Sequence, residues 1–335
     1  MKTKITVFLC ALFLNTAPGW AQTWNLSNTM SATLDNKGTL TIKTTREGGE
    51  AMPDYNYYYT TIPWYDVRSK IFSAVTEPGV TSIGNCAFYG CNNLASVSLP
   101  DSLTRIGDYA FNGCSGLASV TIPATVTSIG KQAFYNCSGF SSITIPVATI
   151  SIAGDAFGGC SGLISATIHA TLISDGIFSG SSISTVTFGH TVKHIGSNTF
   201  SNCQNLISVT IPNPVESIGH TAFSNCKSLE SVTIGNSVES LGANAFANCS
   251  KLASISFSKE LTTIGANAFS GCTGLESVVL PAKVETIGVS AFQSCTRLKS
   301  VEIPRSVTAI GANAFNGCNV LAEVAVHWAT PLVIS

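Results

Sequence analysis

Cysteine is the residue type whose number and spacing most suggest chemistry. Ten of the twelve cysteines recur at one place in a repeated pattern, at Cys91, Cys114, Cys137, Cys160, Cys203, Cys226, Cys249, Cys272, Cys295 and Cys318. In an oxidising compartment such thiols could form disulfides, and thiolates also bind zinc. Equivalent positions of stacked repeats point in the same direction, so they neither face each other for a bridge nor close into a tetrahedron. We therefore predict reduced, buried thiols that pack as small hydrophobic side chains, and no metal site.

Cys86 lies outside this register, and we predict it to be the exposed thiol. Histidine is the next candidate, because His190, His194 and His220 could form a metal pair across neighbouring repeats. No carboxylate or cysteine accompanies them with ligand-like spacing, so surface positions are the simpler interpretation. The chain also has no G-x-S-x-G, H-E-x-x-H or glycine-rich phosphate motif. We predict no catalytic residues, no cofactor and no enzymatic activity.

The overall composition narrows the class of protein further. The 335 residues are 45% hydrophobic and only 10% charged, with a formal net charge of -1. Such a chain can bury a large core, which excludes intrinsic disorder for most of it. It has no block of Lys and Arg to neutralise phosphates, which argues against nucleic acid as a partner.

Internal repetition is the strongest signal, and it determines which elements position any functional side chain. A phenylalanine marks the register of eleven units, at Phe88, Phe111, Phe134, Phe157, Phe178, Phe200, Phe223, Phe246, Phe269, Phe292 and Phe315. The spacing is 23 residues except around Phe178, where it is 21 and then 22. In that unit Ser181 replaces the usual cysteine and Ile177 the usual alanine, and we predict a local kink there.

Each unit reads L-x-x-V-x-I-P-x-x-V-x-x-I-G-x-x-A-F-x-x-C-x-x, numbered here as repeat positions 1 to 23 with Leu94 at position 1. Alternation at positions 4 and 6 predicts a short strand, which the proline at position 7 ends. Positions 10 and 13 predict a second extended segment, and the glycine at position 14 predicts a backbone conformation that is unfavourable for other residues. Phenylalanine and cysteine, three residues apart, predict one helical or 3₁₀ turn.

A single unit of this size cannot fold alone, because the apolar surface that it buries does not offset its conformational entropy. Stacking completes the burial and adds hydrogen bonds between parallel strands. The predicted fold class is therefore a right-handed solenoid of about eleven 23-residue repeats, with parallel β-strands and short turns or 3₁₀ segments. A small β-rich N-terminal cap is expected to precede it.

The repeat resembles the leucine-rich repeat of the Bacteroides surface protein A (BspA) type, from about Val80 to Val326. The preceding segment, including Gly38-Thr-Leu-Thr-Ile and Pro63-Trp64, also resembles the amino-terminal part of that family. The resemblance implies a leucine-rich repeat solenoid in a bacterial secreted or surface protein, an adhesin for matrix proteins or other cells. One departure is the missing asparagine ladder, whose place is taken by Ser102, Thr125, Pro214, Ser237, Glu260 and Lys283.

Two surfaces are candidates for binding, and the first is the outward face of the predicted strands. Repeat positions 3 and 5 point outward and are mostly Ser and Thr, which predicts a nearly neutral, hydroxyl-lined concave face. The candidate ligand-binding residues are Ser119, Thr121, Ser142, Thr144, Ser165, Thr167, Ser208, Thr210, Ser231 and Thr233. The alternative is that these are simply polar residues suited to a solvated sheet.

The second candidate surface is the aromatic segment over 55–65, which holds five of the eight tyrosines. The alternative binding residues are Tyr55, Tyr57, Tyr58, Tyr59, Trp64 and Tyr65. Exposed tyrosine and tryptophan suit contacts with proteins or glycans. The same residues would otherwise cover the first repeat as part of the cap that a solenoid needs.

The amino terminus predicts secretion. Lys2 and Lys4 precede an apolar run over 5–14 and the small-x-small pattern Gly19-Trp20-Ala21, which is typical of a signal peptide cleaved near Ala21. Ten apolar residues are too few for a membrane span, and nothing else in the chain reaches that length. We therefore expect a secreted or cell-surface location and no membrane span.

The predicted domains are a signal peptide over 1–21, an amino-terminal cap over 22–78, the solenoid over 79–322 and the start of an incomplete carboxyl-terminal cap over 323–335. The predicted function is that of a non-enzymatic, secreted or cell-surface leucine-rich repeat protein, which acts as an adhesin or protein-binding module. Its expected partner is an extracellular or host-matrix protein or another cell surface. The alternative is a glycan-binding or envelope-structural module.

Overall fold

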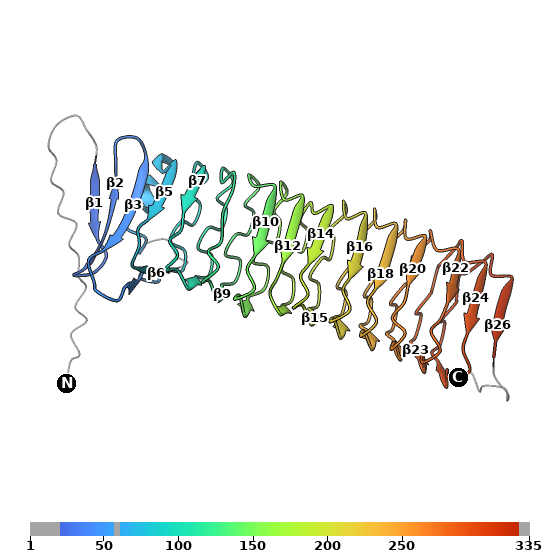
Figure 1. Ribbon diagram of the computed structural model, residues 1–335. Helices are drawn as coiled ribbons and strands as arrows, with labels where there is room; N and C mark the ends of the chain where they lie inside the picture. Colours follow the sequence, from blue (N-terminus) through green and yellow to red (C-terminus); the bar gives the residue numbers. More distant parts are fainter. Residues whose placement is uncertain (1–20, 57–60, 328–335) are drawn as a thin grey trace, which may run out of the picture.

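The computed structural model describes residues 21–56 and 61–327, and Figure 1 shows them as a long parallel β-solenoid. The predicted signal peptide, apart from Ala21, lies outside the described residues, and so does the 328–335 part of the predicted carboxyl-terminal cap. The described residues contain a single 3₁₀ helix, η1 (Tyr65–Lys70), and no α-helix. None of the described segments forms a helix of the length and hydrophobicity that a membrane span requires.

A small antiparallel sheet lies at the amino-terminal end of the solenoid and is continuous with it. The strands β1 (Gln22–Asn25), β2 (Met30–Leu34) and β3 (Thr39–Thr44) pair antiparallel in sequence order. β3 then pairs in parallel with β5 (Ser73–Thr76), which pairs in parallel with β7 (Ser96–Ser98). The long-strand side of the solenoid therefore begins on the amino-terminal strands rather than on an open edge.

The first strand of each repeat forms the long-strand row. After β7, its members are β10 (Ser142–Ile145), β12 (Ser165–Ile168), β14 (Thr185–Phe188), β16 (Ser208–Ile211), β18 (Ser231–Ile234), β20 (Ser254–Ser256), β22 (Ser277–Val279), β24 (Ser300–Ile303) and β26 (Glu323–Val326). Neighbours pair in parallel at equivalent repeat positions, as Thr210 with Thr233. Positions 4 and 6 are mostly buried and positions 3 and 5 mostly exposed, as the alternation predicts.

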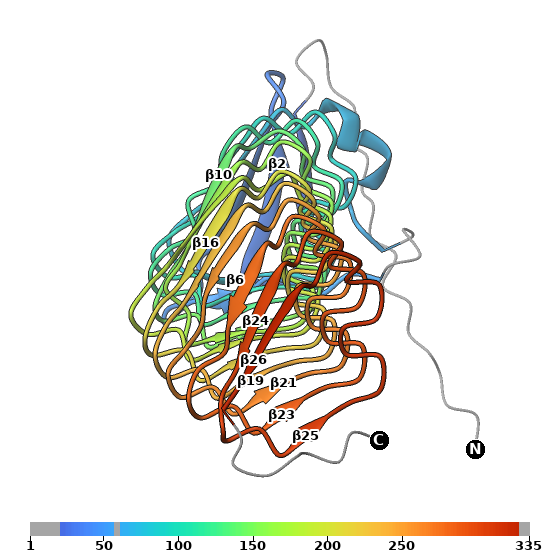
Figure 2. The ribbon, with the colours of Figure 1, turned by 90° about the vertical axis from the view of Figure 1, so that its right-hand side faces the viewer.

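The second extended segment of each repeat forms the short-strand row. Its members are β4 (Glu50–Ala51), β6 (Val80–Ile83), β8 (Arg105–Ile106), β9 (Ser128–Ile129), β11 (Ser151–Ile152), β13 (Leu172–Ile173), β15 (His194–Ile195), β17 (Ser217–Ile218), β19 (Ser240–Leu241), β21 (Thr263–Ile264), β23 (Thr286–Ile287) and β25 (Ala309–Ile310). Viewed along the stack, the long strands lie on one side of a roughly triangular section, the short strands on a second side and turns on the third (Figure 2).

The short unit, defined here as 163–182, interrupts the short-strand row. It has 20 residues in place of 23, because two are missing between Ile168 and Ile173 and one between Ser181 and Ile183. The short-strand row is divided between β11 and β13. The long strand of this unit, β12, pairs with both β10 and β14, and the long-strand row is divided elsewhere, between β7 and β10, between β14 and β16 and between β20 and β22. The rings of Phe157 and Phe178 still stack at 5.5 Å, with an interplanar angle of 18°. The irregularity of this unit is thus a break in the short-strand sheet beside a continuous core.

The core is a column of the register phenylalanines. Successive rings from Phe88 to Phe315 stack with centroids 5.0 to 5.5 Å apart, and the interplanar angles are small. Offset stacking of this kind adds to the large apolar area that each ring buries. The ring of Trp64, which comes from the segment before η1, lies 6.3 Å from that of Phe88 and covers the first ring of the column.

The expectation for the glycine at position 14 is wrong. Gly107 and Gly130 do not adopt positive φ, but a Cβ on Gly130 would lie 2.4 Å from the backbone nitrogen of Asp108 in the preceding unit. Glycine is required because the backbones of neighbouring units approach closely here. Positive φ occurs instead at positions 16 and 20, as at Tyr109 (56°) and Gly113 (74°).

Candidate binding surface

The cysteine column forms a repeated hydrogen bond inside the solenoid. Cys114 Sγ donates to the backbone oxygen of Phe88 at 3.1 Å. The same contact, at 3.0 to 3.3 Å, is made by Cys137, Cys160, Cys203, Cys226, Cys249, Cys272, Cys295 and Cys318. All ten cysteines of the column are free thiols, and all but the half-buried Cys318 are buried, which confirms the prediction. Burial raises the pKa of the Cys91 and Cys272 thiols to about 12, so these thiols are protonated at neutral pH.

The prediction of an exposed Cys86 is wrong, because its side chain is only 2% exposed. The cause is a segment about thirty residues earlier in the chain. Tyr55 donates its backbone N–H to the backbone oxygen of Asn85 at 3.0 Å, and Asp54 accepts the backbone N–H of Asn85 at 2.8 Å. Burial, with the negative charges of Asp108 and Asp54, raises the pKa of Cys86 to about 11. Cys86 is therefore an unreactive core residue.

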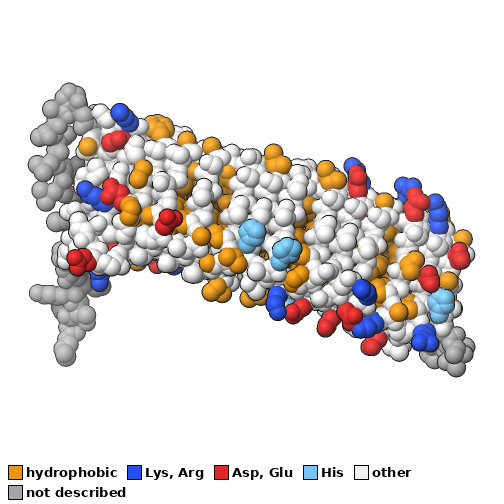
Figure 3. Space-filling view, in the orientation of Figure 1, with side chains coloured by type: hydrophobic (Ala, Val, Ile, Leu, Met, Phe, Trp, Pro, Cys, Tyr) orange, Lys and Arg blue, Asp and Glu red, His pale blue; other side chains and the backbone are white. Residues whose placement is uncertain are grey.

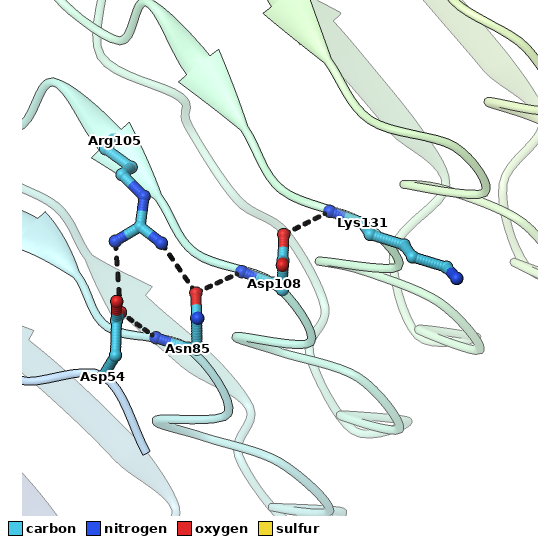
Figure 4. A network of polar contacts seen from close by, with 5 residues as sticks. All are labelled: Asp54, Asn85, Arg105, Asp108 and Lys131. Carbon is cyan, nitrogen blue, oxygen red and sulfur yellow. Dashed lines mark hydrogen bonds and ion pairs between the residues drawn. The ribbon is translucent and has the colours of Figure 1, made fainter. Parts of the chain in front are cut away.

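A polar network fastens this segment to the first repeats (Figure 4). Asp54 Oδ1 also accepts from Arg105 Nη1 at 3.1 Å, and Arg105 Nη2 donates to Asn85 Oδ1 at 2.7 Å. Asn85 Oδ1 in turn accepts the backbone N–H of Asp108, whose Oδ1 accepts the backbone N–H of Lys131, both at 2.8 Å. The side chains of Asp54, Asn85 and Asp108 each accept a backbone N–H from a unit further along the chain. These acidic residues therefore act in stacking rather than as free ligands.

The histidines do not assemble a metal site, since no group of three or more His, Cys, Asp or Glu suited to a metal occurs among the described residues. His194 Nδ1 lies 2.9 Å from Ser217 Oγ, and its Nε2 lies 3.9 Å from Glu216 Oε2. For Ser217 to act as a nucleophile activated by His194, the site would also need a substrate pocket and hydrogen-bond donors for an oxyanion. His194 and Glu216 are partly exposed on the short-strand row, so this contact is a surface interaction.

The hydroxyl face, defined as the ten Ser and Thr residues predicted from positions 3 and 5, lies on the long-strand side. Seven are exposed, namely Ser119, Thr121, Ser142, Thr144, Ser208, Thr210 and Thr233. Three are half-buried, namely Ser165, Thr167 and Ser231. Between Lys131 and Lys193 the only charged residues are Asp155 and Asp175, and Figure 3 shows few charges in this part of the body. The structure thus brings these hydroxyls together on a face that is nearly uncharged.

The aromatic segment is divided between core and surface. Trp64 is 1% exposed, and its Nε1 donates to the backbone oxygen of Ala87 at 2.8 Å. Tyr55 packs edge-on against Trp64 at 5.8 Å, and burial raises the pKa of its hydroxyl well above the usual value. Tyr65 is half-buried, with the Arg68 guanidinium 3.8 Å from its ring centroid. Tyr57, Tyr58 and Tyr59 lie outside the described residues. Trp64 and Tyr55 thus pack at the start of the core column.

One hollow was not anticipated from the sequence. It is an open hollow of about 670 Å³ beside the start of the long strands β12 to β18, where the turn before Ile183 is one residue shorter than its neighbours. Its lining residues are Ser161, Gly162, Ile164, Ser182, Ser184, Asn205, Ile207, Ser228, Glu230 and Lys251. The missing residue in the pattern was the available signal, but the lining of the hollow comes from five consecutive units, so its shape depends on how they stack.

Comparisons with known proteins agree with this architecture. A profile described as BspA type leucine rich repeat region matches residues 81–207 and 193–322. Among solved structures, a leucine-rich repeat protein from Eubacterium ventriosum is 26% identical with a TM-score of 0.50, covering 89% of this chain and 95% of that one. One from Bacteroides ovatus is 24% identical with a TM-score of 0.53, covering 93% and 94%.

A leucine-rich cell surface protein from Faecalibacterium prausnitzii is also similar, at 27% identity and a TM-score of 0.48, covering 93% of this chain and 95% of that one. No match was found among curated proteins. The profile covers well over half of the chain, and its repeats coincide with the units described above. The chain therefore belongs to the BspA type leucine rich repeat family.

Proposed function

We propose that this chain is a non-enzymatic, secreted or cell-surface protein-binding module of the adhesin kind, which engages an extracellular protein through the hydroxyl face. The observation that carries the proposal is a contrast between interior and exterior. The column thiols and the carboxylates of Asp54 and Asp108 are used in stacking. Thr121, Thr144 and Thr210, by contrast, stand exposed in a nearly uncharged array. Extended faces of solenoids are suited to recognition of large partners.

Secretion is supported by the sequence of the amino terminus, where Lys2 and Lys4 precede an apolar run and a small-x-small pattern. Membership in a family whose relatives include secreted and surface proteins supports the same location and the absence of catalysis. Because the hydroxyl face lacks charge, we expect an affinity that depends weakly on salt, unlike that of a charge-steered complex.

The alternative is a glycan-binding or envelope-structural module. The observation that favours glycans is the partly exposed Tyr65, which adjoins the rest of the aromatic segment. A glycan ligand is expected to depend on that segment, so Tyr57→Ser, Tyr58→Ser and Tyr59→Ser together should abolish its binding.

The test is capture by the immobilised chain over 22–335 from a panel of purified extracellular-matrix proteins, with a glycan array in parallel. We expect at least one protein to bind, with an affinity that changes less than about threefold between low and high salt. Binding to glycans alone would establish the alternative. If neither panel is retained above the level of a chain denatured before immobilisation, the binding function is wrong.

A further inference from the structure

The hollow beside the short unit differs from the rest of that edge in its apolar residues. Ile164 and Ile207 occupy repeat position 2, on either side of Ser184, and are 54% and 52% exposed. The other units carry Ala, Ser, Glu or Lys there and no large apolar residue, as at Ala95, Ala118 and Lys299. With neighbouring strands about 4.8 Å apart, the two isoleucines flank a gap of about 10 Å. Exposed isoleucines on both walls of one hollow mark a place for an apolar group.

Two charged residues at the carboxyl-terminal end of this hollow have no side-chain partner among the described residues. Glu230 and Lys251 line the hollow, and both are exposed without a side-chain hydrogen bond or ion pair. The equivalent Glu276, two units later, holds both Arg297 and Lys299. The carboxylate of Glu230 can bind a positively charged group of a partner, and the ammonium of Lys251 can bind a negatively charged one.

Polar groups lie between these two features. Ser184 Oγ donates to the backbone oxygen of Ile164 at 3.3 Å, and Asn205 Nδ2 donates to that of Ser182 at 3.5 Å. A serine hydroxyl that donates once retains capacity to accept, so Ser184 Oγ can receive a backbone N–H. No residue that lines the hollow is aromatic, which leaves no ring for a sugar to stack on. The lining therefore favours a polypeptide over a glycan.

We propose that this hollow binds an extended peptide segment of a partner protein, with an apolar side chain between Ile164 and Ile207 and a charged side chain against Glu230 or Lys251. The proposal rests on the proposed protein-binding function and adds a contact beside the hydroxyl face. Several apolar and polar contacts on a preformed surface suit an affinity in the micromolar range.

The experiment selects a displayed library of random twelve-residue peptides on the full chain and measures the affinity of the enriched peptides in synthetic form. The expected consensus is an apolar residue close to a charged residue. Ile164→Ser with Ile207→Ser should weaken binding about tenfold or more, because the buried apolar contact is lost. Serine already occupies this position in other units, for example at Ser141, so the fold should be unaffected.

The matched control is Val279→Ser, which removes an exposed apolar side chain (65%) from the outward face of β22 and should leave the affinity unchanged. Glu230→Gln with Lys251→Gln should weaken binding and reduce its salt dependence. The proposal is overturned if no peptide is enriched, if the enriched peptides bind the isoleucine double variant equally well, or if glycans bind the hollow instead.

The proposed function and this inference fail in distinguishable ways. If a captured matrix protein still binds the isoleucine double variant but not a chain with lysines on the hydroxyl face, the function stands and the hollow is not its contact. If the double variant alone loses the protein, the hollow is the main site. If no protein binds wild type while peptides do, the hollow is a peptide site without the proposed adhesin role.

Discussion

The regular units around Phe223 and Phe246 and the short unit over 163–182 share a core but differ at the surface. In the regular units the two rings stack at 5.2 Å and 2°, and both strand rows are continuous. In the short unit the ring of Phe178 stays in the column, whereas the short-strand row is divided between β11 and β13. Five large apolar side chains are exposed in or beside it, namely Val147, Ile150, Ile164, Leu172 and Ile207.

This difference shows which residue positions of the repeat are constrained by the core. Ring stacking and turn hydrogen bonds fix the positions that face the core, because a missing ring or thiol leaves a cavity or an unpaired carbonyl. Lost residues are accommodated where they remove only a segment of surface turn. Variation in this chain therefore lies at the edges and outer faces of the solenoid.

The largest expected effect is alkaline unfolding, which the core column controls. Burial raises the pKa of Cys91, Cys160, Cys203 and Cys272 from 9.0 to about 12. Above pH 9 the unfolded chain loses thiol protons that the folded chain retains, so stability falls as the pH rises from 9 to 12. Each such thiol contributes about 1.4 kcal/mol per pH unit to this loss.

The measurement is the urea midpoint at pH 7, 9, 10 and 11. The loss should become shallower when Cys160, Cys203 and Cys272 are replaced by serine, because serine does not ionise in this range. An unchanged pH dependence in the triple variant would show that these thiols are not responsible.

The second prediction compares the two regions within the ring column. Phe223→Ala removes a fully buried ring from the middle of the stack and should destabilise the chain by about 3–5 kcal/mol. The loss of stability for Phe178→Ala should lie at the lower end of this range. The ring of Phe178 stacks at 5.5 Å on both sides, whereas that of Phe223 stacks at 5.2 Å on both sides. Equal denaturation midpoints for the two variants would remove the distinction between the regions.

The third prediction uses the glycines at and near position 14. A Cβ on Gly242 would lie 2.6 Å from backbone atoms of Gly219 and His220, so Gly242→Ala should cost about 1–3 kcal/mol. On Gly154, beside the break in the short-strand row, the nearest atom would be Asp175 O at 3.5 Å. Gly154→Ala should therefore change stability by less than about 1 kcal/mol. Thermal unfolding of both variants checks this, and a comparable loss at Gly154 would contradict the close-approach explanation.

The smallest effect is expected on the hydroxyl face. Ser208→Ala changes an exposed outward side chain of β16 and should alter the free energy of unfolding by no more than about 0.5 kcal/mol. Chemical denaturation of Ser208→Ala, measured alongside Phe223→Ala, tests the assignment of inward and outward positions. A loss above about 2 kcal/mol would mean that the face is part of the core.

The repeat pattern predicted the features that recur, because each is repeated ten or eleven times and set by neighbours at a fixed spacing. The two strand rows, the phenylalanine column and the burial of the column cysteines follow from alternation and spacing alone. The positive φ at position 16 could not be predicted, because Tyr109, Gln132 and Thr221 adopt it without the usual glycine.

Contacts that occur only once could not be predicted from the repeat pattern. Cys86 is buried because the chain around Asp54 and Tyr55 returns against Asn85, a contact that no repeat position encodes. The hollow between Ile164 and Ile207 lies beside the turn that is one residue shorter, and its lining comes from several neighbouring units. The roles of the ten hydroxyl residues in binding stay a prediction.

The most direct test of the binding account is the affinity of the captured protein for the chain with Thr121→Lys, Thr167→Lys and Thr210→Lys. These side chains stand on the outward face of the long-strand side, so the thermal midpoint should stay within about 2 °C of wild type. We predict a loss of affinity of at least about tenfold, because three charges without partners would be buried in the contact. An unchanged affinity, with loss of binding only on replacing Tyr57, Tyr58 and Tyr59 by serine, would contradict the account.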